Sequence, residues 1–221
     1  MMDSHEDVRR LMSYRVKEIY LTLQGEGFHA GRTAVFCRFA GCNLWNGREQ
    51  DRADAVCNFC DTDFVGTDGP GGGVYQSPHE LADRIVECWG QRGGEPWVVF
   101  TGGEPALQLD APLVAAVRER GFKAAVETNG TRFLPFDADW LCVSPKPNAE
   151  LVVRAGDELK LVFPVSGLDP AAFEKLPFHH YFLQPLDDEN LGENLRATAA
   201  YCLEHPRWRV SLQRHKVIGI R

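Results

Sequence analysis

Three cysteines in the first third of the chain have the types and spacing of a metal centre. Cys57 and Cys60 are separated by two residues, and Cys42 lies upstream, with fourteen residues between it and Cys57. An iron–sulfur cluster ordinarily takes four thiolates, so three leave one iron free to bind a further ligand. The three cysteines therefore indicate a metal centre that can take part in chemistry.

A fourth cysteine leaves another kind of site open. Cys37, together with the other three, could form a tetrahedral zinc site without catalytic activity. Cys37 lies in an apolar, strand-like run, where period-two alternation places it on the same face as Val35 and Phe39. We therefore expect Cys37 to pack in the core, and a non-catalytic zinc module with four cysteine ligands remains the alternative from another class.

The composition is that of an ordinary globular protein. Hydrophobic residues at 44% and charged residues at 25% exclude a disordered chain. No apolar run is long enough for a membrane span or a signal peptide, so we expect a cytoplasmic protein with reduced thiols. A net charge of −7 argues against a broad basic face for nucleic acid. We expect the three remaining cysteines, Cys88, Cys142 and Cys202, to behave as small buried hydrophobes.

Short apolar runs alternate with helical patterns along the chain. The pattern predicts strands at Val16–Leu23, Ala34–Phe39, Trp97–Thr101, Lys123–Thr128, Trp140–Val143, Glu158–Val162, Tyr181–Leu183 and Arg209–Leu212. It predicts helices at Pro78–Gln91, Ala111–Arg120, Pro170–Leu176 and Asn190–Glu204.

This alternation predicts an α/β fold with a mainly parallel sheet. Polar and glycine-rich motifs follow the strands, and the carboxyl ends of parallel strands converge on one rim, where barrel enzymes place their sites. The chain is short for a complete eight-unit barrel, so we expect a shortened, open barrel of the TIM type. We assign 16–221 to this single domain, 1–15 to a flexible N-terminal extension, and 43–56 to an insertion in the cysteine loop that forms a partly exposed helical excursion.

The ordered set of motifs resembles the radical S-adenosylmethionine (SAM) superfamily. It has a Cys-x-aromatic-Cys pair, an upstream cysteine, and a strand that ends in Gly102-Gly103-Glu104-Pro105. Most members have three residues between the first two cysteines. The fourteen found here resemble the 7-carboxy-7-deazaguanine synthase branch, which belongs to queuosine biosynthesis. Further strings of that branch run through almost the whole chain: TLQGEG at 22–27, FCRFAGCNLW at 36–45, CDT at 60–62, ETNG at 127–130, SPK at 144–146 and HK at 215–216.

The resemblance implies a reaction and its cofactors. The reaction converts 6-carboxy-5,6,7,8-tetrahydropterin to 7-carboxy-7-deazaguanine, by hydrogen abstraction at C6, ring contraction and loss of ammonia. The cofactors are a [4Fe–4S] cluster, SAM and Mg²⁺. The resemblance also implies a homodimer and an electron donor such as flavodoxin or ferredoxin. The other enzyme class that fits the motifs is a radical SAM activase, which forms a glycyl radical on a partner protein.

The resemblance assigns roles to residues of this sequence. It places Cys42, Cys57 and Cys60 on the cluster and Thr62 on Mg²⁺. Residues expected to bind SAM are Asn58, Phe59, Asp61, Gly102, Gly103, Glu104, Glu127, Ser144, Pro145, Lys146, Gln184 and Asp187. Residues expected to bind the pterin are Leu23, Gln24, Gly25, Glu26, Arg38, Thr101, His215 and Arg221.

The chemistry of the residues themselves supports part of these assignments, for the pterin site and for the SAM site. The guanidinium of Arg38 suits bidentate capture of a carboxylate, and its side chain should point away from the face of Cys37. Gln24 and Glu26 offer amide and carboxylate partners for a pterin edge. Gly102 and Gly103, which lack a Cβ, would permit close approach of the backbone to the SAM amine.

Overall fold

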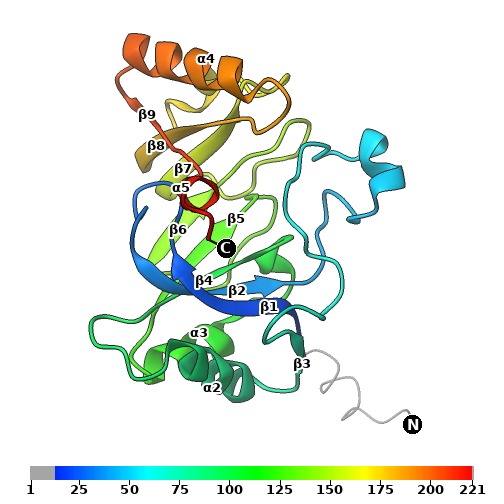
Figure 1. The fold of residues 1–221 in the computed structure, drawn as a ribbon, viewed down its shortest axis with the longest axis vertical. Helices are drawn as coiled ribbons and strands as arrows, with labels where there is room; N and C mark the ends of the chain where they lie inside the picture. Colours follow the sequence, from blue (N-terminus) through cyan, green and yellow to red (C-terminus); the bar gives the residue numbers. More distant parts are fainter. Residues whose placement is uncertain (1–12, 221) are drawn as a thin grey trace.

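The computed structural model describes residues 13–220, and over that range the chain forms one open nine-stranded sheet (Figure 1). The order across the sheet is β3-β1-β2-β4-β5-β6-β7-β8-β9. The strands are β1 (Tyr14–Leu23), β2 (Thr33–Phe39), β3 (Gly73–Tyr75), β4 (Trp97–Gly102), β5 (Lys123–Thr128), β6 (Trp140–Val143), β7 (Gly156–Phe163), β8 (Phe178–Pro185) and β9 (Trp208–Val210).

Most of the sheet is parallel. From β2 across to β9 every neighbouring pair is parallel, whereas β1 pairs antiparallel with both β2 and β3. The sheet does not close on itself, because β3 and β9 are its two edges. The prediction of an α/β fold with a shortened, open barrel is confirmed.

Helices cover the outside of the sheet in two places. Helices α2 (Pro78–Trp89) and α3 (Ala111–Glu119) pack together below the β1–β5 half, and α4 (Leu191–Glu204) covers β8 and β9 (Figure 1). A short helix, α5 (Arg214–Ile218), follows β9. Residues 13–220 also contain three 3₁₀ turns: η1 (Glu49–Asp54), η2 (Pro105–Leu107) and η3 (Pro170–Phe173).

The local sequence explains where α2 and α3 begin. Ser77 accepts a hydrogen bond from the Glu80 amide, and Pro78 occupies the first helical turn, where its missing N–H costs nothing. Asp110 caps α3 in the same way by accepting a hydrogen bond from the Leu113 amide at 3.0 Å. Asp110 also accepts a hydrogen bond from the Tyr14 hydroxyl at 2.7 Å, which ties the start of α3 to β1.

Alternation along the strands separates the core from the interior of the barrel. On β2, Val35, Cys37 and Phe39 face α2 and α3 in the largest hydrophobic cluster. On β7, Leu159 and Leu161 lie in a second cluster under α4. The alternate residues of both strands, among them Arg38 and Lys160, face the interior instead.

Several predicted boundaries are wrong. Strand β1 begins at Tyr14, inside the range assigned to the N-terminal extension, because the Tyr14 ring is buried in the core. The helix predicted at Pro170–Leu176 is only the 3₁₀ turn η3. The last strand is Trp208–Val210, one residue earlier than expected at its start and two at its end. β3, η2 and α5 were not predicted, whereas η1 falls within the insertion expected to form a partly exposed helical excursion. Residues 1–12 lie outside the described residues.

Within the described residues, no helix is both long and apolar enough to cross a membrane.

Asp110→Ala removes a helix cap and the hydrogen-bond acceptor of Tyr14 together. We expect it to lower the free energy of unfolding by about 2 kcal/mol, measured by urea denaturation. Asp169→Ala is the matched control, because Asp169 is exposed and caps only the 3₁₀ turn η3, so its effect should be smaller. Equal losses in the two variants would contradict the importance of the Tyr14 contact.

Candidate functional site

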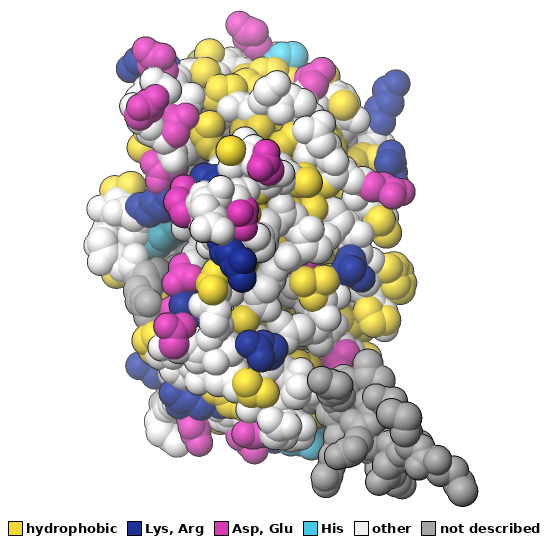
Figure 2. All heavy atoms as spheres, turned by 90° about the vertical axis from the view of Figure 1, so that its right-hand side faces the viewer, with side chains coloured by type: hydrophobic (Ala, Val, Ile, Leu, Met, Phe, Trp, Pro, Cys, Tyr) yellow, Lys and Arg dark blue, Asp and Glu magenta, His cyan; other side chains and the backbone are white. Residues whose placement is uncertain are grey.

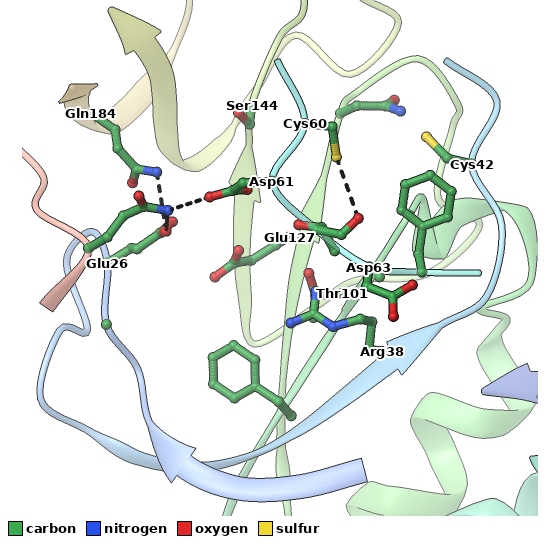
Figure 3. Close-up of a pocket in the computed structure, with 18 of the residues that line it drawn as sticks. Glu26, Arg38, Cys42, Cys60, Asp61, Asp63, Thr101, Glu127, Ser144 and Gln184 are labelled. Carbon is green, nitrogen blue, oxygen red and sulfur yellow. Dashed lines mark hydrogen bonds between the residues drawn. The ribbon is translucent and has the colours of Figure 1, made fainter. Parts of the chain in front are cut away.

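A cavity of about 500 Å³ opens at the carboxyl ends of the parallel strands. This volume lies in the range that binding sites for small molecules and cofactors usually have. Figure 3 shows Cys42 and Cys60 at one end of the cavity and Glu26 and Gln184 at the other, with Glu127 between them.

Most of the residues predicted for the site line this one cavity. They are Cys42, Cys57, Cys60, Phe59, Asp61, Thr62, Gly102, Gly103, Glu127, Ser144, Lys146, Gln184, Asp187, Leu23, Gln24, Gly25, Glu26, Arg38, Thr101 and His215. They come from segments across the whole sequence, so the fold brings the separate motifs together.

Three predicted residues do not line the cavity. Asn58 is exposed, and Pro145 is buried without reaching the cavity surface. Glu104 is enclosed behind the cavity wall. Arg221 lies outside the described residues.

The three cysteines differ in their electrostatic surroundings. A hydrogen bond from Cys57 lowers the pKa of the Cys60 thiol to about 6, and burial raises the pKa of the Cys42 thiol. The Cys42 sulfur accepts a hydrogen bond from the Leu44 amide at 3.4 Å. Three sulfur donors on one cavity wall fit a cluster, in which each thiolate binds a different iron.

The arrangement does not fit a zinc module. Cys37 is fully buried in the core cluster, where burial raises the pKa of its thiol, and it does not line the cavity. Among the described residues, no three His, Cys, Asp or Glu side chains meet closely enough to chelate a single ion. The expectation that Cys37 packs in the core is confirmed.

The two glycines after β4 are required by the packing of the chain itself. A Cβ on Gly103 would lie 2.1 Å from the Gly41 carbonyl oxygen, and one on Gly102 would lie 2.3 Å from that of Phe39. Gly102 also has a φ of 140°, which side chains disfavour. The glycines therefore let the turn after β4 press against the start of the cysteine loop, and the Gly103 backbone remains on the cavity surface.

Glu104 links the ends of two strands instead of reaching the cavity. Its side chain is 0% exposed, and its carboxylate accepts hydrogen bonds from the Thr128 hydroxyl at 2.6 Å, the Asn129 amide at 2.7 Å and the Ala106 amide at 2.9 Å. Burial raises the pKa of Glu104, and these hydrogen bonds oppose the rise. The Glu104 amide donates to Gly41 at 3.0 Å, so this residue also supports the cysteine loop.

A buried lysine that the sequence motifs did not point to lies in the cavity wall. Lys160 is 6% exposed, and its ammonium lies 2.5 Å from Glu26 and 3.5 Å from Glu127. Burial alone would lower the pKa of Lys160, but Glu127 and Glu26 raise it well above its ordinary value. Burial alone would raise the pKa of Glu26, but Lys160 holds it below the ordinary value. Both groups therefore stay charged.

Amide and guanidinium side chains surround these charges. The Gln24 side chain donates to Glu127 at 2.8 Å, and Gln184 donates to Glu26 at 3.2 Å. Arg38 donates to Glu18 and to the Tyr20 hydroxyl, each at 3.0 Å, and its side chain is 17% exposed. Arg38 does face the interior, as its position on β2 predicted, and an ion pair fixes it there.

The segment around α5 holds the cysteine loop against the strand ends. Lys216 forms ion pairs with Asp61 at 2.7 Å and Asp187 at 2.5 Å, and Gln213 donates to both Asp61 and Glu26. His215 packs so closely on Gly25 that a Cβ there would lie 2.0 Å from its Nδ1. Of these three residues the motifs assigned only His215 to the site, because the partners of Gln213 and Lys216 lie far away in the sequence.

Comparison with known proteins identifies relatives of the whole described domain. No protein-family model matches the chain. The 7-carboxy-7-deazaguanine synthases of Bordetella pertussis and Bradyrhizobium diazoefficiens are each 59% identical to it, over 95% of this chain and 100% of theirs. The crystal structure of QueE from Escherichia coli superposes with a TM-score of 0.67 at 24% identity, covering 97% of this chain and 100% of that one, and so has the same fold.

Glu104→Ala would leave three donors without their acceptor, two of them in buried hydrogen bonds. We expect the free energy of unfolding to fall by about 3 kcal/mol, measured by chemical denaturation. Glu189→Ala is the control, because Glu189 is an exposed glutamate before α4. A Glu104 variant as stable as the control would show that these hydrogen bonds do not hold the strand ends.

Proposed function

Because the chain belongs to the 7-carboxy-7-deazaguanine synthase family, we propose that it converts 6-carboxy-5,6,7,8-tetrahydropterin to 7-carboxy-7-deazaguanine with loss of ammonia. It would thus act as a carbon–nitrogen lyase of the radical SAM type, in 7-deazapurine biosynthesis. The observation that carries the proposal is a single cavity lined by both the three cysteines and the polar side chains suited to a pterin.

The donor set fits the proposed cofactors. Cys42, Cys57 and Cys60 would each bind one iron of a [4Fe–4S] cluster and leave the fourth iron for SAM. When bound, the cluster and SAM supply the one-electron chemistry that abstracts hydrogen from the substrate. The backbone of Gly102 and Gly103 forms the adjoining wall.

Several of the side chains proposed to bind SAM lie just after the ends of strands. Lys146 donates to the Ser144 hydroxyl at 2.6 Å, so the two side chains present one polar surface to the cofactor. Phe59, Asp61, Glu127, Gln184 and Asp187 line the same cavity and would complete the cofactor site. Glu104 would act indirectly, by holding the turn that carries the two glycines.

The substrate would lie deeper, over β1 and β2. Arg38 would bind the pterin carboxylate, oriented by Glu18 and Tyr20. Glu26, kept ionised by Lys160, would accept hydrogen bonds from the donor-rich pterin edge, beside Gln24. Leu23, Gly25, Thr101 and His215 line the cavity too and would also contact the substrate.

A magnesium ion would be held between Thr62 and the substrate. Thr62 follows the cysteine loop and lines the cavity, and a hydroxyl oxygen suits a hard cation that keeps waters and ligand oxygens in its shell. Assembly as a homodimer, reduction by a flavodoxin or ferredoxin, and a cytoplasmic location complete the proposal.

The two alternatives lack support. The relatives of this chain are synthases and not activases, and the interior of the cavity carries charges suited to a small polar heterocycle. Cys37 lies in the core, which removes the fourth ligand of a zinc module.

Anaerobic incubation with SAM, a reductant, Mg²⁺ and the carboxypterin tests the proposal directly. We expect 7-carboxy-7-deazaguanine as the product, detected by mass spectrometry. Cys42→Ala should abolish turnover and lower bound iron, whereas Cys37→Ala should retain both, because Cys37 lies in the core. An intact cluster without the deazaguanine product would contradict the proposed reaction.

Lys160→Met should make substrate binding depend on pH. Without the ammonium, only hydrogen bonds from neutral amides such as Gln213 oppose burial, so the pKa of Glu26 rises and this carboxylate becomes protonated at a higher pH than in the unaltered enzyme. We expect the KM for the pterin to rise about ten-fold from about pH 8 to about pH 6 in the variant and to stay level in the unaltered enzyme. Lys175→Met, at an exposed position, is the control. A level KM in Lys160→Met would count against ionised Glu26 as a substrate ligand.

A further inference from the structure

The insertion between Cys42 and Cys57 contains an arginine that contacts both ends of the cysteine loop. The insertion includes η1, which lies away from the sheet (Figure 1). Figure 2 shows the face towards which this segment projects, where basic and acidic side chains of the described residues are interspersed. Arg52 is the basic residue in the last turn of η1 and forms an ion pair with Glu49 at 2.7 Å.

Arg52 binds the backbone of the Cys57–Cys60 turn. Its Nη1 donates to the carbonyl oxygen of Asn58 at 3.0 Å and to that of Cys60 at 2.9 Å. Its Nε donates to the Glu49 carboxylate at 2.7 Å, which orients the guanidinium from the other side. The Arg52 side chain is 30% exposed, so these contacts lie at the surface of the loop.

The same guanidinium stacks on the segment that follows Cys42. Its central carbon lies 4.2 Å from the centre of the Trp45 ring, a cation–π distance. Trp45 is 8% exposed, packs edge-on against Phe64 and donates to the Arg48 carbonyl at 3.3 Å. The ring is thus a fixed surface, three residues from Cys42.

We propose that Arg52 is a positioning residue that sets the spacing of the cluster cysteines across the insertion. It joins the Cys42 side of the loop, through Trp45, to the Cys60 side, through the carbonyl oxygens. The inference rests on the proposed function, since it takes Cys42, Cys57 and Cys60 as the cluster ligands. The insertion then has a role, because its fourteen residues include Arg52, whose guanidinium joins the two sides of the cysteine loop.

Arginine suits this position better than lysine. The guanidinium is planar, so it can stack on an indole while donating hydrogen bonds in its own plane. A lysine ammonium keeps the charge but cannot stack as a plane and donate along several in-plane directions at once. Replacement of Arg52 by lysine therefore separates the effect of the guanidinium geometry from the effect of the positive charge.

The charge has a separate, measurable consequence. A cation beside the cluster favours its reduced form, so it raises the reduction potential. Loss of the guanidinium should shift the potential to a more negative value, and lysine should restore part of that shift.

The first experiment uses the apoprotein and needs no cluster. Hydrogen exchange of the Cys57 amide, which donates to the Leu44 carbonyl oxygen at 3.4 Å across the loop, should become about ten-fold faster in Arg52→Met and also faster in Arg52→Lys, because the contacts that hold the two sides of the loop together are lost or weakened. Glu49→Gln, which leaves the carbonyl and Trp45 contacts in place, should exchange almost as slowly as the unaltered protein. Unchanged exchange in Arg52→Met would overturn the proposal.

The second experiment uses the reconstituted holoenzyme. We expect Arg52→Met to lose iron to a chelator about ten-fold faster and to have a more negative midpoint potential. Arg154→Met makes the same change of charge at an exposed position and should match the unaltered protein. Equal iron loss and equal potential in the two variants would overturn the proposal.

The proposal stays testable if Arg52→Met fails to fold or if the unaltered protein binds no iron. If Arg52→Met does not fold, Arg52→Lys decides: normal exchange and iron retention in the lysine variant would overturn the geometric role. If the unaltered protein holds no iron, the proposed function fails, and exchange in the apoprotein still tests the loop contact.

Discussion

The structure depends on the strict two-residue alternation of the parallel strands. On β2 and β7, one set of side chains packs under helices and the other set faces the barrel interior. A shift of register by one residue would exchange Cys37 with Arg38, and Leu159 with Lys160. The same residues that exclude water from the outer layer therefore fix which polar groups face the cavity.

The interior keeps charges that a purely structural core would not need. A buried ion pair contributes little to stability, because desolvation of the two charges offsets their attraction. Lys160 nevertheless lies between Glu26 and Glu127 at hydrogen-bonding and ion-pair distances. This arrangement makes sense for a cavity that must present ionised carboxylates to a ligand away from bulk water.

The sequence predicted the layers and the rim of the cavity well, because strand alternation and the glycine motifs are local signals. Arg38 and Cys37 were assigned to opposite faces correctly from their neighbours alone. The same alternation also predicts that Lys160 faces the interior, since it lies between Leu159 and Leu161 on β7. Its partners, however, are distant in sequence, so its role was not apparent.

Other features depend on tertiary contacts that no local pattern encodes. Glu104 follows two glycines in a motif assigned to SAM, yet its carboxylate is enclosed by two donors from the end of β5, Thr128 and Asn129, besides the local Ala106 amide. The contacts of α5 depend on Asp61 and Asp187, which are far away along the chain. The motif at 215–216 indicated His215, but the short length of α5 gave no sign of a helix that packs on the cysteine loop.

The ion pair between Asp61 and Lys216 joins residues separated by 155 positions. During synthesis, the cysteine loop leaves the ribosome long before the lysine that ties it down exists. In that interval the loop lacks its contact with α5, and the mouth of the cavity lacks one wall. The contact between the cysteine loop and α5 can therefore form only after Lys216 has been synthesised, so this wall of the site depends on the end of the described chain.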